Sequence, residues 1–321
     1  MSQPSDPEPD ARRRVLLLAH TGRDAAREVA RASLRALTER GIAVRLLADE
    51  AADLGVDVDD AGPDLLELAT TDVGVSRDCE VTLVIGGDGT ILRAAEVTHE
   101  AGTPILGVNL GHVGFLAEAE EDHVGATIAA LVERDYTIED RLTLDVRVYR
   151  GGELVTSTFA VNEASVEKAS RQRMLEVVVE VDGRPLSRWG CDGVVCATPT
   201  GSTAYNFSAG GPVVWPGVEA LLMVPISAHA LFARPLVAAP DSVLAVEVLD
   251  RTEGAGVLWC DGRRTVDLPP GARIEVRRAG TPLRLVRLTD SPFTDRLVAK
   301  FGLPVQGWRG AAERRPTWST S

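Results

Sequence analysis

One short stretch of the sequence combines bare backbone with an acidic side chain, directly after an apolar run. Residues 81–85 are apolar and β-rich, and Gly86, Gly87, Asp88, Gly89 and Thr90 follow them. The pattern predicts a buried strand, a glycine turn and the start of a helix. Glycine lets a phosphate chain approach the backbone, and a helix N-terminus offers unpaired N–H groups to an anion.

Asp88 is unexpected in an anion-binding turn, because a carboxylate repels a phosphate. It suits the turn if it holds a metal ion or takes a proton. A tight strand-to-helix turn with a solvated Asp is the structural alternative. We treat Asp88 as a candidate catalytic residue, and we take as candidates for phosphate binding Gly86, Gly87, Gly89, Thr90 and, from the predicted helix, Arg93.

A carboxamide and a carboxylate stand side by side at the end of a second apolar strand, 159–161. They are Asn162 and Glu163. Such a pair can hold two neighbouring hydroxyls, as on a ribose. A polar surface turn explains the same two residues equally simply.

A longer segment, 190–208, is rich in hydroxyls. Asp192-Gly193 is a turn that leads into a strand, and a short helix that carries Tyr205 is expected after the turn at 198–203. Helix capping accounts for some of these hydroxyls. The five Ser and Thr residues between 198 and 208 exceed what one cap needs, and they suit recognition of a sugar, a phosphate and a base.

A second acid-glycine turn, Asp261-Gly262, is followed by Arg263 and Arg264. A hairpin turn with solvated arginines is the alternative to a site here. Asp261 is therefore added to the candidates.

Several familiar chemistries do not match the chain. It has no G-x-x-x-x-G-K-[ST] motif, its glycine turn does not fit G-x-G-x-x-G, and Ser202 lacks the context of a nucleophile elbow. The histidines show no metal-binding spacing.

Composition and charge bound the possible partners. The chain has 321 residues, 45% hydrophobic and 25% charged, with a formal net charge of −13. These values are typical of a globular protein, and the negative charge argues against broad binding to nucleic acid or to a membrane. The four cysteines fit no zinc pattern and are expected as free thiols. Without an apolar stretch of secretory or membrane-spanning type, the expected location is cytoplasmic.

The hydrophobic pattern predicts two domains. Strands at 15–19 and 43–47 flank an amphipathic helix, which is typical of a βαβ unit and a parallel sheet. From about residue 136, short alternating strands and an Asp-Gly hairpin signal predict a mostly antiparallel half. The expected division is a disordered tail 1–13, an α/β domain 14–135, a β-rich domain 136–290, a C-terminal helix 291–308 and a disordered tail 309–321.

Taken together, the motifs at 86–90, 162–163 and 198–205 resemble the NAD kinase family, in that family's order. The likeness covers about residues 14–305 and is to bacterial, actinobacterial members. The glycine motif alone is shared with diacylglycerol kinase, sphingosine kinase and phosphofructokinase relatives. The resemblance implies an α/β domain with a parallel sheet and a β-rich domain, with the last helix returning to the first domain.

The resemblance also implies an activity: transfer of the γ-phosphate of ATP, or of another donor such as polyphosphate, to the 2′-hydroxyl of the adenosine ribose of NAD. Asp88 would orient or deprotonate that hydroxyl, or help to hold a Mg²⁺ that the donor phosphates mainly bind. Phe115 would pack against the dinucleotide, and Asp192 would contact its nicotinamide side, across a subunit interface if the chain forms a dimer or tetramer. The adenosine half would be held by Asn162, Glu163, Thr200, Thr203, Ala204, Tyr205 and Ser208.

Two other functions remain open from the sequence. A diacylglycerol-type lipid kinase shares the glycine turn, but it should carry a basic or apolar membrane-facing surface, which a −13 chain does not suggest. A dinucleotide-binding sensor without activity is the non-enzyme alternative, and the presence of Asp88 argues against it.

Overall fold

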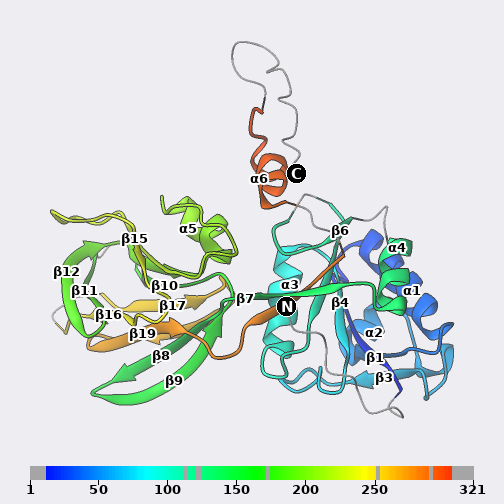
Figure 1. Cartoon of the computed structure of the whole chain (residues 1–321). Helices are drawn as coiled ribbons and strands as arrows, with labels where there is room; N and C mark the ends of the chain where they lie inside the picture. The colour runs from blue at the N-terminus through cyan, green and yellow to red at the C-terminus, as the bar shows by residue number, and fades with distance from the viewer. Residues whose placement is uncertain are drawn as a thin grey trace.

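The computed structural model describes residues 12–111, 114–120, 124–170, 174–250, 254–288 and 292–305. They form an α/β domain and a β-rich domain, with the last helix standing above their junction (Figure 1). The predicted fold class is confirmed.

The first domain is built on one eight-stranded sheet. Seven strands run in the order β3-β2-β1-β4-β5-β20-β7, and β6 pairs with β5. Among the described residues, all strand pairs of this sheet are parallel except β20 with β7. The strands are β1 (Arg14–Ala19), β2 (Ala43–Leu47), β3 (Leu66–Ala69), β4 (Val81–Ile85), β5 (Ile105–Asn109), β6 (Ala119–Glu120), β7 (Thr137–Arg141) and β20 (Leu283–Arg287).

Helices cover both faces of this sheet, because alternate side chains of its central strands point to opposite faces. Leu17 of β1 packs with apolar residues of α1 (Asp24–Thr38), α2 (Ala48–Leu54) and α4 (Val124–Glu133). The next residue, Leu18, packs in a different cluster with α3 (Asp88–Thr98). A short 3-10 turn, η1 (Val58–Asp60), completes this domain.

The second domain consists of two six-stranded antiparallel sheets that face each other. One has the order β12-β11-β16-β19-β8-β9 and the other β15-β14-β13-β10-β17-β18. Their shared core is almost wholly aliphatic, apart from the buried Trp189. The first sheet contains β8 (Leu144–Arg150), β9 (Glu153–Ala160), β11 (Leu175–Val181), β12 (Arg184–Cys191), β16 (Leu244–Val248) and β19 (Ala272–Arg278). The second contains β10 (Glu163–Lys168), β13 (Gly193–Ala197), β14 (Leu221–Ile226), β15 (Leu236–Ala238), β17 (Gly256–Cys260) and β18 (Arg264–Leu268).

The structure moves two of the predicted domain boundaries. Strands β7 and β20 fall in the range 136–290 that was expected to form the β-rich domain, but they pair with each other and with β5 in the first sheet. A strand pattern shows that a segment is extended and half-buried, and it does not show which sheet the segment joins. The chain therefore enters the second domain after β7 and leaves it before β20.

The chain ends also differ from expectation where they are described. Arg13, assigned to the disordered tail, donates to both carboxylate oxygens of Glu80 and to the carbonyls of Leu131 and Val132. Residues 1–11 and 306–321 lie outside the described residues. The predicted C-terminal helix is α6 (Phe293–Phe301), and it contacts both domains.

Candidate active site

The strand order creates a crevice at the ends of β1 and β4. From β1 the chain runs outward to β2 and β3 and then returns to β4 on the other side. In open α/β sheets, ligands bind at such a switch point, outside the carboxyl ends of the strands. A hollow of about 550 Å³ lies there, lined by Ala19, His20, Thr21, Gly22, Arg23, Gly87, Gly89, Thr90, Arg93 and Arg263.

The glycine turn forms one wall of this hollow. Helix α3 begins at Asp88, and Gly87 is its N-cap residue. A Cβ at Gly86 would lie 2.4 Å from Oγ1 of Thr90. A residue with a side chain would therefore clash with Thr90 at this position of the turn. A Cβ at Gly89 would meet nothing within 4 Å, which leaves backbone open to the hollow.

Arg93 is held at the hollow by a buried acid that the sequence analysis did not identify. Its Nη2 donates to the Ala19 carbonyl at 2.9 Å and to Glu50. Glu50 is 2% exposed and also accepts a hydrogen bond from the Ala19 N–H at 2.7 Å. Burial raises the pKa of Glu50, and the Arg93 charge opposes that shift. Glu50 thereby fixes both Arg93 and the carboxyl end of β1.

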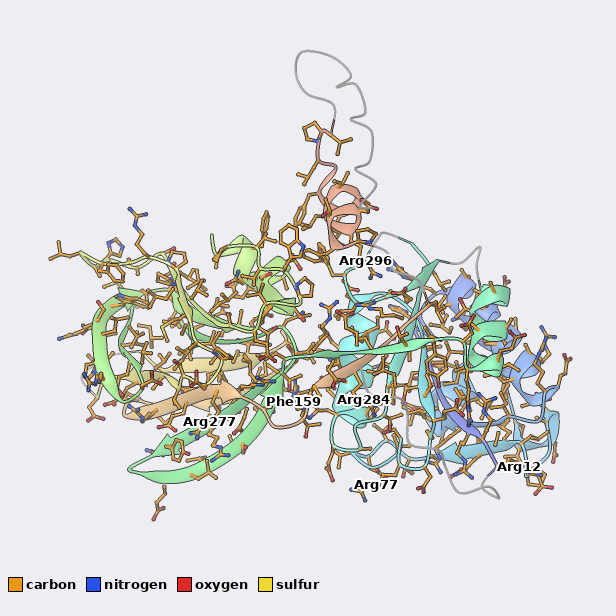
Figure 2. The ribbon with its side chains drawn as sticks, viewed as in Figure 1. Arg12, Arg77, Phe159, Arg277, Arg284 and Arg296 are labelled. Atoms are coloured by element: carbon orange, nitrogen blue, oxygen red, sulfur yellow. The ribbon has the colours of Figure 1, made fainter. Side chains whose placement is uncertain are left out.

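A second cation reaches the hollow from the other domain. Arg263 follows the turn at 261–262, and its Nε donates to Glu96 of α3 at 2.8 Å. Beside it, the Arg264 guanidinium lies 4.2 Å from the centre of the Phe159 ring, which stacks on His99, the residue that follows α3. Phe159 lies at the junction of the domains (Figure 2).

Asp88 is oriented by a nearby loop of its own domain. Its carboxylate accepts hydrogen bonds from the backbone N–H groups of Phe115 and Leu116, at 3.0 and 3.1 Å. Each oxygen of an ionised carboxylate can accept more than one hydrogen bond. Asp88 can therefore still bind a hydroxyl or a cation while this loop holds it.

The structure brings the second and third predicted segments together. Glu163 begins β10 and pairs with Ala197, the last residue of β13. The turn after β13 then lies against the Asn162 backbone, and a Cβ at Gly201 would be 2.0 Å from the Asn162 carbonyl oxygen. The Tyr205 N–H donates to the Glu163 carboxylate. Asn162, Glu163 and Tyr205 therefore form one site.

Asp261 holds the backbone of this segment in place. Its carboxylate accepts hydrogen bonds from the backbone N–H groups of Val161 and Asn162, at 2.7–3.0 Å, and from Arg264 at 2.6 Å. Asp261 thus fixes the backbone that presents Asn162 and Glu163. Because Arg263 is two residues further on, one turn joins this site to the hollow.

Glu163 is an unusual acid in its surroundings. It is 6% exposed, and its Oε2 has no hydrogen-bond partner among the residues that the structure describes. Burial, with the charge of Asp261 nearby, raises the pKa of Glu163 to about 8. A buried polar atom without a partner is uncommon in folded proteins, and a bound ligand or water is one way in which it can be satisfied.

Some hydroxyls of the hydroxyl-rich segment have a structural role. Thr198 accepts from the Gly201 N–H, and the Ser202 hydroxyl bonds to both polar backbone groups of Val214. These hydroxyls hold the turn. The predicted binding residues of this segment lie on η3 (Thr200–Thr203), at Ala204 and on α5 (Tyr205–Ser208). Ser208 is exposed and Thr200 is buried.

Asp192 lies at the opposite end of the β10–β13 pair from Glu163. It precedes Gly193, which pairs with Glu167, and its carboxylate accepts from Lys168. The Lys168 hydrogen bond lowers the pKa of Asp192. Asp192 is five residues along the strand from Ala197, the partner of Glu163, which is a distance of about 17 Å. This spacing is on the scale of an extended dinucleotide.

Phe115 is surrounded by protein aromatics. Its ring centre lies 5.7 Å from that of Phe293 and 6.1 Å from that of Phe301, both on α6. The expected contact of Phe115 with a dinucleotide stays a prediction.

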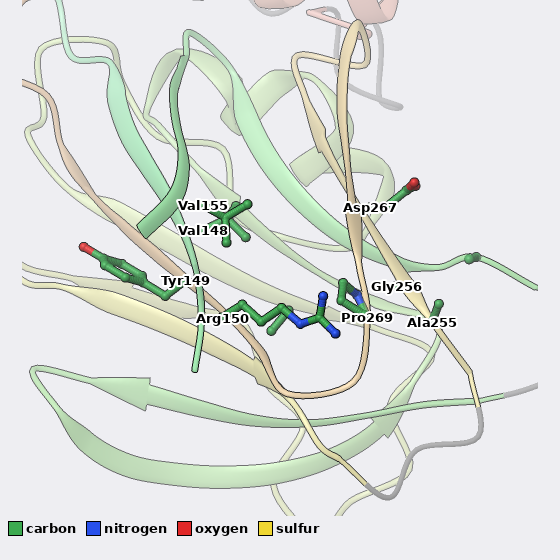
Figure 3. Close-up of a pocket in the computed structure, with 10 residues that line it drawn as sticks. Val148, Tyr149, Arg150, Val155, Ala255, Gly256, Asp267 and Pro269 are labelled. Atoms are coloured by element: carbon green, nitrogen blue, oxygen red, sulfur yellow. The ribbon is translucent and has the colours of Figure 1, made fainter. Parts of the chain in front are cut away.

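A second hollow, of about 580 Å³, lies within the β-rich domain and contains none of the predicted residues (Figure 3). Its walls are mainly aliphatic or small, with two charged residues, Arg150 and Asp267. Since it lacks the glycine turn and the polar segments, it is not the candidate active site.

Within the described ranges, no cluster of three or more His, Cys, Asp or Glu side chains could hold a metal ion, and no helix is long and apolar enough to cross a membrane.

A hollow of about 550 Å³ at a helix N-terminus, with a cluster of polar residues on the neighbouring domain, is the arrangement of a two-domain nucleotide-binding phosphotransferase. Two family models match the chain: the ATP-NAD kinase N-terminal domain over residues 15–136 and the ATP-NAD kinase C-terminal domain over 161–288. The chain belongs to the NAD kinase family.

Individual relatives agree with this assignment. The chain is 60% identical over 307 residues to the NAD kinase of Thermobifida fusca, covering 94% of this chain and 93% of that protein. It is 59% identical to NAD kinase 2 of Streptomyces avermitilis, covering 93% and 97%. Yeast NADH kinase complexed with NADH has the same fold, with a TM-score of 0.81 at 24% identity over 93% of this chain and 90% of that one. An NAD kinase from Archaeoglobus fulgidus in complex with ATP gives a TM-score of 0.64 at 25% identity, covering 91% and 98%.

Proposed function

We propose that this chain transfers the γ-phosphate of ATP to the 2′-hydroxyl of the adenosine ribose of NAD, forming NADP. The observation that carries the proposal is the turn at 261–264. Through Asp261 it fixes the backbone at Asn162, next to Glu163, and through Arg263 it reaches the hollow at the glycine turn. A donor phosphate and an acceptor ribose would therefore meet across one short turn.

The hollow is the proposed donor site. Phosphoryl transfer depends on positioning and on neutralising charge that spreads over the phosphate oxygens. The open backbone at Gly87 and Gly89 and the start of α3 suit phosphate oxygens. Arg93 and Arg263 would supply positive charge from opposite sides. Inorganic polyphosphate would use the same groups, so the donor preference is part of the test below.

A divalent cation, most simply Mg²⁺, would be bound at this site mainly by the donor phosphates. The described residues offer no metal-binding cluster, so donor phosphates would provide most of its ligands, with Asp88 as a carboxylate at the turn. The ion would neutralise charge on the phosphates. Asp88, held by the Phe115 and Leu116 N–H groups, would orient the 2′-hydroxyl or take its proton.

The polar cluster that β10 and α5 form is the proposed acceptor site. With a pKa near 8, Glu163 is protonated at neutral pH and can both donate to and accept from a ribose hydroxyl. Its buried Oε2 has no partner within the described part of the chain, which supports a hydrogen bond to a ligand group. Asn162, Thr200, Thr203, Ala204, Tyr205 and Ser208 would complete the adenosine pocket.

We further propose that the chain is a homodimer or homotetramer and that Asp192 contacts the nicotinamide end near a subunit interface. Asp192 is close to Ser227 and His229, in the segment after β14. Large apolar side chains on this segment and on β12 are exposed, among them Leu186, Leu231 and Phe232. A surface of this kind is typical of protein association.

A substrate panel tests the proposed reaction. Purified full-length protein is incubated with Mg²⁺, with ATP or polyphosphate as donor, and with NAD, NADH or diacylglycerol as acceptor, and products are identified by mass spectrometry. We expect NAD to gain one phosphate from ATP and diacylglycerol to gain none. Phosphorylation of the lipid, or none of any acceptor, would contradict the proposal.

A further inference from the structure

The loop that holds Asp88 is itself held from its other side. Gly114 lies so close to Asp88 that a Cβ on it would be 2.3 Å from the carboxylate Oδ1. The next two residues, Phe115 and Leu116, donate their N–H groups to the same carboxylate. On the far side of this loop lies Arg296 of α6.

Arg296 binds the loop through three acceptors. Its Nη1 donates to the Ala117 carbonyl at 2.7 Å and to the Phe115 carbonyl at 3.3 Å, and its Nη2 donates to Glu118 at 2.7 Å. The Arg296 side chain is 12% exposed and that of Glu118 is 1% exposed. Glu118 also pairs with Arg287 of β20 at 2.8 Å, which anchors the guanidinium to the first sheet.

One peptide unit joins the two ends of this arrangement. The Phe115 carbonyl, which accepts from Arg296, and the Leu116 N–H, which donates to Asp88, belong to the same peptide bond. A planar peptide cannot turn one group without turning the other. A charged donor on the carbonyl also polarises the peptide and strengthens the hydrogen bond that its N–H donates.

Aromatic contacts set the position of Arg296. Phe293 and Phe301, on the same helix, pack around the Phe115 ring. They also contact the second domain. The ring centre of Phe301 lies 4.6 Å from that of Phe207 of α5, and the ring centre of Phe293 lies 5.2 Å from that of Trp215. Figure 2 shows Arg296 at the foot of α6, facing the α/β domain. The helix thus connects the loop at Asp88 to the segment of the proposed acceptor pocket.

We propose that Arg296 is a positioning residue for Asp88, acting through the Phe115–Leu116 peptide. The inference rests on the proposed role of Asp88 in phosphoryl transfer. Without the guanidinium, the peptide is free to rotate, its N–H leaves the carboxylate, and Asp88 loses its fixed orientation toward the acceptor hydroxyl. The loss falls on turnover, because the proposed donor and acceptor contacts do not include Arg296.

Three variants on one helix test the role. Arg296→Gln removes the charge and the fork, whereas Arg296→Lys keeps the charge beside Glu118 but cannot reach both carbonyls in the same way. Lys300→Gln removes an equal charge from an exposed position of α6 and serves as the matched control. We expect kcat to fall about 10- to 100-fold in both Arg296 variants, the scale of a small misplacement. KM for ATP should change little in the Arg296 variants. The control variant Lys300→Gln should have a kcat close to that of the native chain.

A double-mutant cycle with Asp88→Asn separates positioning from a general loss of structure. If Arg296 acts through Asp88, Arg296→Gln lowers kcat in the native chain and adds little in the Asp88→Asn background. Free guanidinium ion should restore part of the turnover of Arg296→Ala only when Asp88 is present. Unfolding temperatures of all variants establish that each one is folded.

The outcomes are distinct. Normal kcat in a folded Arg296→Gln or Arg296→Lys, or an equal fold-loss in both backgrounds, overturns the positioning role alone. A fully active Asp88→Asn overturns the proposed role of Asp88 and, with it, this inference. If Arg296→Gln does not fold, Arg296→Lys and the guanidinium experiment carry the same decision.

Discussion

Asp88 is the residue on which the proposed chemistry depends most. Asp88→Asn keeps the side-chain size and one acceptor oxygen but removes the charge. We expect kcat for NAD phosphorylation to fall about 100-fold or more, the scale of a general acid–base contribution, with the fold intact. The measurement is steady-state turnover, with circular dichroism as the control for folding. Turnover near that of the native chain would remove Asp88 from the mechanism.

Glu163 is predicted to select the acceptor. Glu163→Ala leaves a ribose hydroxyl without its partner, which weakens NAD phosphorylation by about 1–3 kcal/mol, or roughly 5- to 150-fold in kcat/KM. KM for ATP should change much less. Kinetics with each substrate varied in turn measure both effects. A change confined to ATP would assign Glu163 to the donor site.

The raised pKa of Glu163 also predicts a pH dependence of stability. The folded chain keeps this acid protonated up to about pH 8, whereas an unfolded Glu loses its proton near 4.5. The folded state therefore binds more protons between these values, and stability falls as pH rises through them. Glu163→Gln cannot ionise, so we expect native Tm to fall relative to this variant from about pH 4.5 to about pH 8. A constant difference across that range would show that Glu163 ionises normally.

At the scale of elements, the turn Cys260–Arg264 joins the two sites. Arg263→Ala should raise KM for ATP and leave KM for NAD nearly unchanged, because Arg263 lines the donor hollow and Asp261 still fixes the acceptor backbone. Arg77→Ala, which breaks an exposed ion pair with Glu100 elsewhere in the first domain, is the matched control. An effect on NAD alone would place Arg263 with the acceptor.

Elements with a local signal could be predicted from the sequence. The glycine turn after β4 was found because strand, turn and helix start are adjacent in the chain. The assignment of β20 to the first sheet could not be found, because its partners β5 and β7 are distant in sequence. For the same reason Glu50 could not be distinguished from its acidic neighbours Asp49 and Asp53. Its role depends on the contact with Arg93, which is distant in sequence. Arg296 was missed for this reason as well, since its acceptors lie about 180 residues away.

At the scale of the whole molecule, the described residues contain every motif used in the proposed reaction. Removing residues 1–11 and 306–321 should leave turnover unchanged, since no chemical motif lies in either segment. Extending the first deletion through Arg13 should lower Tm, because Arg13 bonds Glu80 and the carbonyls at the end of α4. Activity assays and thermal unfolding check both statements. A trimmed chain that folds but does not turn over would show that the ends carry function.

The central claim concerns the two domains and α6 together: a donor phosphate bound in the glycine-turn hollow is transferred to a ribose held beside Glu163. The position of the phosphate in the product tests that claim most directly. Full-length protein is incubated with ATP, Mg²⁺ and NAD, and the purified product is examined by ³¹P and ¹H NMR. We expect one phosphomonoester on the 2′-carbon of the adenosine ribose. A phosphate on the 3′-carbon, on the nicotinamide ribose, or on no acceptor at all would contradict the account.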